Sequence, residues 1–146
     1  MTEIPATVHH VGLTVTDPDV SRQWYQRLLN TAPVLDQDFP AVPEHHQDFR
    51  KVVFVLPGGF VLGLLGHPAT DQSQRFDEFG PGLDHLSFGC ADRSELEKWQ
   101  HRLDELGIKH GGIAEGAFGF ALPFRDPDNI ALEFWAPHGA ESDRTG

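Results

Sequence analysis

Two histidines and one glutamate carry the clearest chemical signal in this sequence. His10 and His85 each open a short apolar stretch, and Glu133 lies inside another, IALEFWA. A carboxylate and two imidazoles in apolar surroundings need a partner, because an unpaired charge there is costly. A divalent metal ion is an economical partner, since these three ligands leave coordination positions open for water or substrate. A closed structural zinc site would use four protein ligands, so we expect a catalytic ion here.

An internal repeat makes the two histidines equivalent. The segment from His9, HHVGLTVTDPDVSRQWYQRLLN, aligns without a gap on the segment from Asp84, DHLSFGCADRSELEKWQHRLDE, so that His10 falls on His85. Identities and apolar matches recur along both segments in the same order. Their regularity indicates a duplicated unit.

The same repeat predicts how many ligands the site has. FVLGLLG, from Phe60, aligns on IALEFWA, from Ile130, so that Gly63 stands where the second half has Glu133. Glycine cannot bind a metal ion. We therefore expect three protein ligands, unless His67, further along the same strand, bends back to become a fourth.

Each half of the repeat predicts a strand, a helix and three further strands. In the first half a strand is expected over 9–15, a helix opening at Asp17-Pro18, and strands over 33–38, 50–56 and 60–66. In the second half a strand precedes a helix capped by Asp92 and closed by Gly107, and strands follow over 108–113, 117–124 and 130–136. The fold class is α+β: two tandem βαβββ modules forming a curved, cleft-forming mixed sheet with the helices on the outside.

Alternation along the strands predicts where the chemical residues point. Val11, Leu13 and Val15 form the apolar set that should face the helix, which leaves His10 on the other face. The same reasoning sends His85 and Glu133 away from the helix, and Cys90 into the core. If the two half-sheets curl toward each other, the three proposed ligands line one cleft.

Composition limits the partners. The formal net charge of −11 disfavours nucleic acid and anionic lipid. The apolar stretch from Val52 to Gly66 is too short and broken to span a bilayer, a single cysteine allows no internal disulfide, and no signal peptide is visible, so we expect a cytoplasmic protein. We expect one domain over 1–146, with modules at 9–67 and 83–137, a linker at 68–82 and a frayed tail at 138–146.

Several other residues are candidates for the site. The pocket is expected to be apolar, with walls from Phe118, Phe120, Trp135 and Leu65. Glu133 is expected to serve catalysis as a ligand, and His67 and Glu115 are the candidates for a general base. The loop from Arg75 to Phe79 is expected to be a solvated loop, with a lid as the alternative. The remaining histidines are expected to be structural or surface residues: His9, His45, His46, His101, His110 and His138.

The chain resembles the vicinal oxygen chelate superfamily, which includes glyoxalase I, fosfomycin-resistance metalloenzymes, extradiol dioxygenases and bleomycin-binding proteins. The segments HHVGLTVTD (9–17), GLDHLSFGC (82–90) and FRDPDNIALEFW (124–135) carry the resemblance. It implies that His10, His85 and Glu133 bind a divalent ion, which could be Fe(II), Mn(II), Zn(II), Ni(II) or Co(II). It also implies a small-molecule substrate and a homodimer, often with a site built from both subunits.

The chain departs from the pattern of each subgroup. Glyoxalase I has a carboxylate where Gly63 stands. Fosfomycin-resistance enzymes bind a phosphonate through cationic and hydroxyl side chains, which residues 113–124 of this chain lack. The tyrosine and histidine typical of extradiol dioxygenases correspond here to about Pro123 and to Gly59 or Phe60. The leading hypothesis is an Fe(II)-dependent oxygenase or a lyase/isomerase acting on a hydrophobic substrate. The alternative is a non-catalytic protein that sequesters a drug or metabolite; bleomycin-binding proteins generally lack the three ligands, which argues against it.

Overall fold

The computed structural model describes Glu3 and residues 7–139 of the chain. Its internal contacts divide the chain into two units, and the boundary between them falls between Gln74 and Arg75, inside the predicted linker. Among the described residues, no helix has the length and apolar character needed to cross a membrane.

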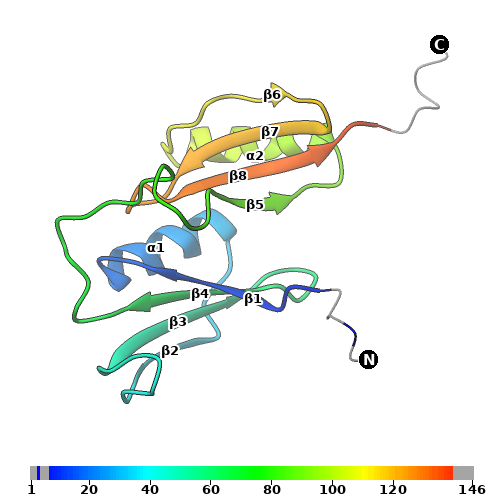
Figure 1. The fold of residues 1–146 in the computed structure, drawn as a ribbon. Coiled ribbons are helices and arrows are strands. Elements are labelled where there is room, and N and C mark those ends of the chain that lie inside the picture. Colours follow the sequence, from blue (N-terminus) through cyan, green and yellow to red (C-terminus); the bar gives the residue numbers. More distant parts are fainter. Residues whose placement is uncertain (1–2, 4–6, 140–146) are drawn as a thin grey trace, which may run out of the picture. The chain divides into compact units, whose positions relative to one another are not determined.

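The first unit is a four-stranded sheet with one helix. Its elements are β1 (His10–Thr14), α1 (Pro18–Leu29), β2 (Leu35–Phe39), β3 (Phe49–Val55) and β4 (Val61–Gly66). The strand order is β1-β4-β3-β2, with β1 parallel to β4 and the other pairs antiparallel. Helix α1 packs on β3 and β4 (Figure 1).

The second unit repeats this arrangement. Its elements are β5 (Leu86–Gly89), α2 (Arg93–Glu105), β6 (Ala114–Glu115), β7 (Gly119–Arg125) and β8 (Ala131–Pro137). The order β5-β8-β7-β6, with β5 parallel to β8, matches the first sheet strand for strand. Helix α2 packs on β7 and β8 (Figure 1). Two four-stranded mixed sheets, each with its helix, confirm the predicted βαβββ duplication.

The predicted helix ends are present. The Asp17 carboxylate accepts hydrogen bonds from the first turn of α1, with Pro18 as the first helical residue. Asp92 accepts from the backbone N–H of Glu95 at the start of α2. At its other end Gly107 has a φ of 69°, a left-handed conformation that glycine adopts without a Cβ penalty.

Burial follows the predicted alternation in both units. Leu13 and Val15 are buried while His10, Gly12 and Thr14 are exposed. In β8 the buried positions are Leu132, Phe134 and Ala136. The side chains with no exposed surface are Tyr25, Leu28, Val52, Phe54, Leu62, Leu64, Leu96, Leu103, Leu122 and Ala136.

Cys90 lies in the core, as predicted. It is a buried free cysteine at 7% exposure. Burial raises the pKa of its thiol to about 11, so it remains protonated near neutral pH.

The strand predicted over 108–113 is wrong. Only Ala114–Glu115 forms β6, and within 108–113 the ladder is reduced to a single bridge between His110 and Phe124. Gly112 has a φ of 75°, outside the range of a strand. The Gly111 N–H still donates to the Pro123 carbonyl oxygen of β7 at 2.9 Å, so the ladder is interrupted at Gly112 and resumes at Ala114.

Candidate functional site

His85 and Glu133 lie side by side in the second unit. His85 directly precedes β5, and Ser87 of β5 pairs with Glu133 of the parallel strand β8. The His85 Nε2 atom is 3.4 Å from Glu133 Oε1. Two ligand atoms, each about 2.1 Å from a shared ion, are separated by roughly 3.0–3.4 Å at octahedral or tetrahedral angles. The spacing therefore fits joint coordination of one divalent ion.

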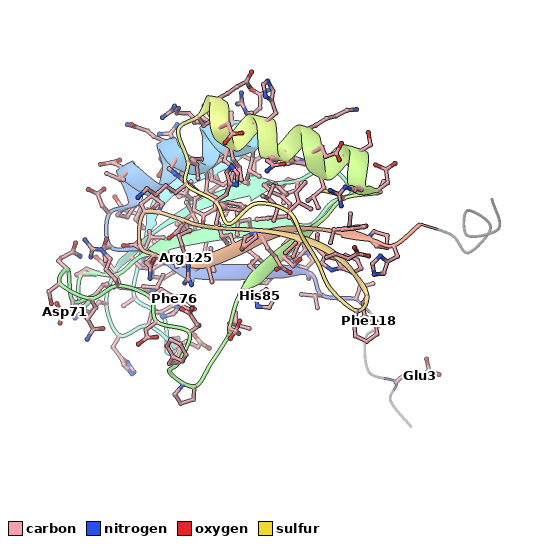
Figure 2. The ribbon with its side chains drawn as sticks, turned by 90° about the horizontal axis from the view of Figure 1, so that it is seen from above. Glu3, Asp71, Phe76, His85, Phe118 and Arg125 are labelled. Carbon is pink, nitrogen blue, oxygen red and sulfur yellow. The ribbon has the colours of Figure 1, made fainter. Side chains whose placement is uncertain are left out.

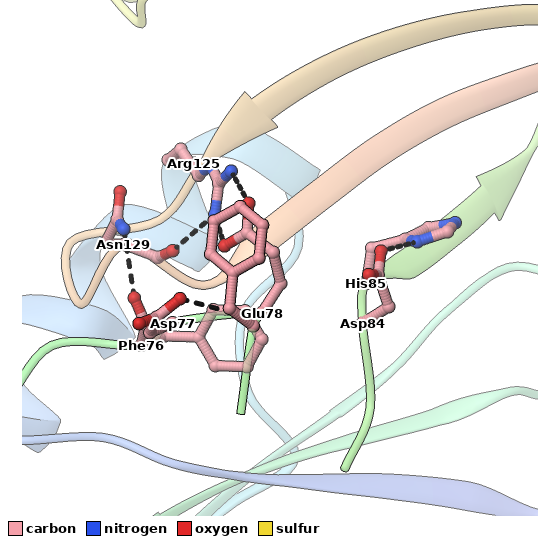
Figure 3. A network of polar contacts seen from close by, with 8 residues as sticks. Phe76, Asp77, Glu78, Asp84, His85, Arg125 and Asn129 are labelled. Atoms are coloured by element: carbon pink, nitrogen blue, oxygen red, sulfur yellow. Dashed lines mark hydrogen bonds and ion pairs between the residues drawn. The ribbon is translucent and has the colours of Figure 1, made fainter. Parts of the chain in front are cut away.

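Asp84 holds the other nitrogen of His85. Its Oδ1 is 2.7 Å from His85 Nδ1 (Figure 3). This hydrogen bond is the main reason that the pKa of His85 is raised, and the charge on Glu133 adds to it. A carboxylate bonded to Nδ1 leaves Nε2 as the atom that faces Glu133.

The first unit holds the equivalent histidine in a similar way. His10 opens β1, and its Nδ1 is 2.7 Å from Nδ1 of His9. The two rings meet edge to face, with centroids 5.0 Å apart. His9 thus occupies the same place relative to His10 as Asp84 does relative to His85.

Strand register supports the predicted equivalence of Gly63 and Glu133. Gly12 pairs with Gly63 in the first unit, as Ser87 pairs with Glu133 in the second. A Cβ placed on Gly63 would meet only ordinary van der Waals contacts, the nearest being the Val11 carbonyl oxygen at 3.7 Å. The position is open but carries no ligand.

His67 lies just beyond β4 among aromatic rings. Its ring centroid is 4.6 Å from that of His45 and 5.7 Å from that of Phe49. Burial lowers the pKa of His67, and the charge on His45 lowers it further. A hollow of about 410 Å³ is lined by Thr16, Pro18, Asp38, Asp48, Phe49, Arg50, Gly66, His67 and Pro68.

Two of the four expected pocket residues lie on the same faces as proposed ligands. Trp135 follows Glu133 by two residues in β8 and is half-buried. In the first unit Leu65 is paired with Thr14, and its Cδ1 lies 3.0 Å from where a Cβ of Gly12 would be. Leu65 therefore lies on the face that His10 shares.

The two phenylalanines lie elsewhere. Phe118 is 85% exposed and sits at the tip of the turn between β6 and β7 (Figure 2). Phe120 pairs with Ala136 and lies beneath the Arg93 guanidinium of α2, 4.8 Å from it. Phe120 thus shares the helix-facing side of the sheet, opposite to Glu133.

Most of the remaining histidines have structural partners. His110 Nε2 is 2.7 Å from Asp104, and His138 Nε2 donates to the Gly116 carbonyl oxygen at 2.9 Å. Glu115, a candidate base, is 3.7 Å from His138 Nδ1. His138 is therefore held rather than frayed, and residues 140–146 of the predicted tail lie outside the described residues.

The loop before β5 is fixed to the turn between β7 and β8. Glu78 accepts two hydrogen bonds from Arg125, at 2.6 and 2.9 Å, and Asn129 donates to the Phe76 carbonyl oxygen at 3.0 Å (Figure 3). The Arg125 guanidinium lowers the pKa of Glu78 to about 2. This loop is therefore anchored, although Phe79 at its end is 93% exposed.

The structure brings together His85 and Glu133 in the second unit and places His10 and His67 in the first. Within either unit alone, the described residues contain no group of three His, Cys, Asp or Glu side chains that could hold a metal ion. Sequence reasoning missed Asp84. The available signal was its alignment with His9, because each residue directly precedes a proposed ligand.

Comparison with known proteins places the chain in a family. The model of the Glyoxalase/Bleomycin resistance protein/Dioxygenase superfamily matches residues 7–134. A glyoxylase/bleomycin resistance protein/dioxygenase domain from Frankia sp. EAN1pec is 35% identical, with a TM-score of 0.80, covering 92% of this chain and 100% of that one. No curated protein sequence matches the chain.

Two more distant structures share the fold. The lactoylglutathione lyase from Agrobacterium tumefaciens is 21% identical with a TM-score of 0.66, covering 92% of this chain and 96% of that one. The fosfomycin resistance protein from Listeria monocytogenes is 16% identical with a TM-score of 0.67, at the same coverage of 92% and 96%. Together with the duplicated βαβββ architecture, the family match and the Frankia domain show that this chain belongs to the Glyoxalase/Bleomycin resistance protein/Dioxygenase superfamily.

Proposed function

We propose that this protein is a divalent-metal-dependent enzyme that acts on a small, hydrophobic, oxygen-bearing molecule. His85 and Glu133 provide two of the ligands. The observation that carries the proposal is the 3.4 Å spacing of their nitrogen and oxygen atoms on adjacent strands. Asp84 behind His85 completes an arrangement common among metal-binding histidines, in which a carboxylate fixes the ring nitrogen that does not bind the metal.

The third proposed ligand is His10. Two side chains do not make a site that retains an ion, so a further ligand must come from outside the second unit. His10 stands at the repeat position equivalent to His85 and leaves its sheet on the face away from the helix. We propose that His10 of the same chain, or of a second copy in a homodimer, supplies it.

The site would combine one contribution from the ion with two from the chain's own residues. The bound ion would polarise two neighbouring oxygen atoms of the substrate as a Lewis acid. Trp135 and Leu65 would form apolar walls that exclude water. His67, whose lowered pKa keeps its imidazole neutral near pH 7, would accept a proton from the substrate.

Metal content tests the proposal. Protein purified without chelators should carry about one divalent ion per chain, and His85→Ala or Glu133→Gln should lose it. His101→Ala is the matched control, because this histidine is 77% exposed on α2, away from both ligands. Wild-type protein that stays metal-free and still binds a ligand tightly would contradict the enzyme and favour a sequestering protein.

Oxygen consumption separates the two enzyme classes within the proposal. With the ion in place, a dioxygenase consumes one O₂ for each substrate molecule turned over. A lyase or isomerase consumes none. The assay is run in a closed cell with metal-loaded protein, and the Glu133→Gln variant serves as the blank.

A further inference from the structure

The two proposed histidine ligands are each bonded, through the same ring atom, to the residue directly before them. In the second unit His85 Nδ1 meets Asp84 Oδ1 at 2.7 Å, and in the first His10 Nδ1 meets His9 Nδ1 at 2.7 Å. These two residue pairs, the His9–His10 dyad and the Asp84–His85 dyad, occupy aligned positions of the repeat, although their first residues differ in type. Both halves of the repeat therefore have a contact to Nδ1 of the proposed ligand histidine, but His9 makes it in the first half and Asp84 in the second.

We propose that Asp84 and His9 are positioning residues that fix the tautomer and orientation of the two ligand histidines, so that each presents Nε2 to a metal ion. This inference rests on the proposed function. In a neutral imidazole one nitrogen carries the proton and only the other can bind a metal. A hydrogen-bond acceptor at Nδ1 keeps the proton there and leaves the Nε2 lone pair free.

The geometry on each side supports these roles. Asp84 is an acceptor when ionised, so His85 must be the donor through Nδ1–H, and its Nε2 is left 3.4 Å from Glu133. In the first dyad one imidazole must donate and the other accept. If His10 is to bind a metal through Nε2, His9 is the acceptor and carries its own proton on Nε2.

The two partners should differ in strength. A carboxylate forms a stronger hydrogen bond with an imidazole than a second neutral imidazole does, because the bond is assisted by charge. Removing Asp84 should therefore weaken metal binding more than removing His9. In metalloproteins, loss of such an outer partner costs about 10- to 100-fold in metal affinity.

Two variants at each position separate positioning from simple packing. Asp84→Ala removes the acceptor, whereas Asp84→Asn keeps an oxygen acceptor without the charge. His9→Ala removes the acceptor, and His9→Asn places an amide oxygen close to where Nδ1 lies. Asp104→Ala is the matched control, because Asp104 forms a 2.7 Å contact with His110, outside the proposed ligand set.

The first readout needs no metal. Long-range ¹H–¹⁵N correlation spectra of metal-free protein at about pH 9, where imidazole is neutral, report which ring nitrogen carries the proton. Wild-type His85 should be in the Nδ1–H form, and Asp84→Ala should shift it toward the Nε2–H form that free histidine favours. Asp84→Asn and Asp104→Ala should leave His85 as in the wild type.

The second readout is Co²⁺ affinity, measured by titration and by the visible spectrum of the bound ion. Asp84→Ala should weaken binding about 10- to 100-fold and Asp84→Asn should recover most of that loss. Asp104→Ala should bind as the wild type does. An Asp84→Ala protein with wild-type tautomer and affinity would overturn the inference while leaving the proposed function intact. If the wild-type protein binds no Co²⁺ but the Asp84→Ala variant still loses the Nδ1–H form of His85, the proposed function is refuted. The role of Asp84 in orienting His85 would then remain.

Discussion

Gly63 is the residue at which the two halves of the repeat differ most in their chemistry. Its pairing with Gly12 matches the pairing of Glu133 with Ser87, so the first unit has a backbone position ready for a ligand but no side chain. The space around a Cβ there is ordinary, with the nearest atoms at 3.7 and 3.8 Å. A longer side chain at this position would extend over the face that His10 shares.

Gly63→Glu should therefore add a fourth ligand to the proposed site. We expect Co²⁺ affinity to rise about tenfold or more, because another carboxylate joins the ion. Gly63→Ala is the control and should leave the affinity unchanged. Titration followed by the visible Co²⁺ spectrum measures both. A Gly63→Glu protein that folds but binds Co²⁺ no more tightly than Gly63→Ala would count against the site.

For single residues, the sequence predicts which face of a strand a side chain occupies, but not which other side chain it contacts. Alternation correctly sent His10, His85 and Glu133 to the faces away from the helices. It could not reveal the contact between Asp84 and His85, because that depends on side-chain rotamers. Residue type did not reveal the equivalence of His9 and Asp84 either, because a histidine and an aspartate share little apart from the ability to accept a hydrogen bond.

Among the strands and helices, the sequence predicts where most strands lie along the chain better than it predicts which face of the sheet each side chain occupies. Phe120 was expected in the pocket, yet its pairing with Ala136 puts it on the helix side. Its alternation with Leu122 and Phe124, both buried, carried that signal in the sequence. The strand expected over 108–113 failed for a local reason, the positive φ of Gly112, which composition alone does not reveal.

Close packing between β7 and β8 predicts one intolerant position. A Cβ on Gly119 would collide with the Ala136 carbonyl oxygen and come within 2.7 Å of the Trp135 ring. Gly119→Ala should lower the free energy of unfolding by about 1–3 kcal/mol, since the strands cannot move apart without breaking their pairing. Gly89→Ala, with nothing within 4 Å of its Cβ, should change it by less than about 0.5 kcal/mol. Urea denaturation followed by tryptophan fluorescence measures both, and equal effects would contradict the packing described.

An ion-pair network fastens α1 to its sheet. Arg50 of β3 donates two hydrogen bonds to Asp36 of β2, at 2.9 and 3.0 Å, and contacts Asp19 of α1 at 2.8 Å. Arg22 adds a contact to Asp36 at 3.0 Å. The hydrogen bonds from Arg50 are the main reason that the pKa of Asp36 is lowered.

Asp36→Asn should destabilise the protein in a pH-dependent way. Near neutral pH we expect a loss of about 1–3 kcal/mol, because Arg50 and Arg22 lose the charge of Asp36 and Arg50 keeps only Asp19 as a charged partner. A lowered folded-state pKa means that the contribution of Asp36 is fully present above its unfolded-state pKa, near 4, and is lost as the pH falls through the folded value. The difference between wild type and variant should therefore begin to shrink as the pH falls below about 4 and should vanish only below the folded-state pKa of Asp36. Asp38→Asn, on the same strand, is the control, and an Asp36 effect that is constant down to pH 2 would contradict this linkage.

At the scale of the whole molecule, the duplication explains both what each unit contains and what it lacks. Each unit has a complete sheet, a helix and one dyad with a proposed ligand histidine, and only the second has the carboxylate. A three-ligand centre therefore requires residues of both kinds of unit. The repeat made this visible in the sequence, because aligned positions reveal both the second histidine and the missing carboxylate.

The number of imidazoles bound to the ion decides whether His10 and His85 share one site. The X-ray absorption fine structure of Co²⁺-loaded wild-type protein distinguishes imidazole ligands from oxygen ligands by multiple scattering from the rings. We predict two imidazoles, from His10 and His85, with the remaining positions filled by oxygen, including that of Glu133. One imidazole would remove His10 from the site, three would bring in another histidine such as His67, and either count would contradict the proposed centre.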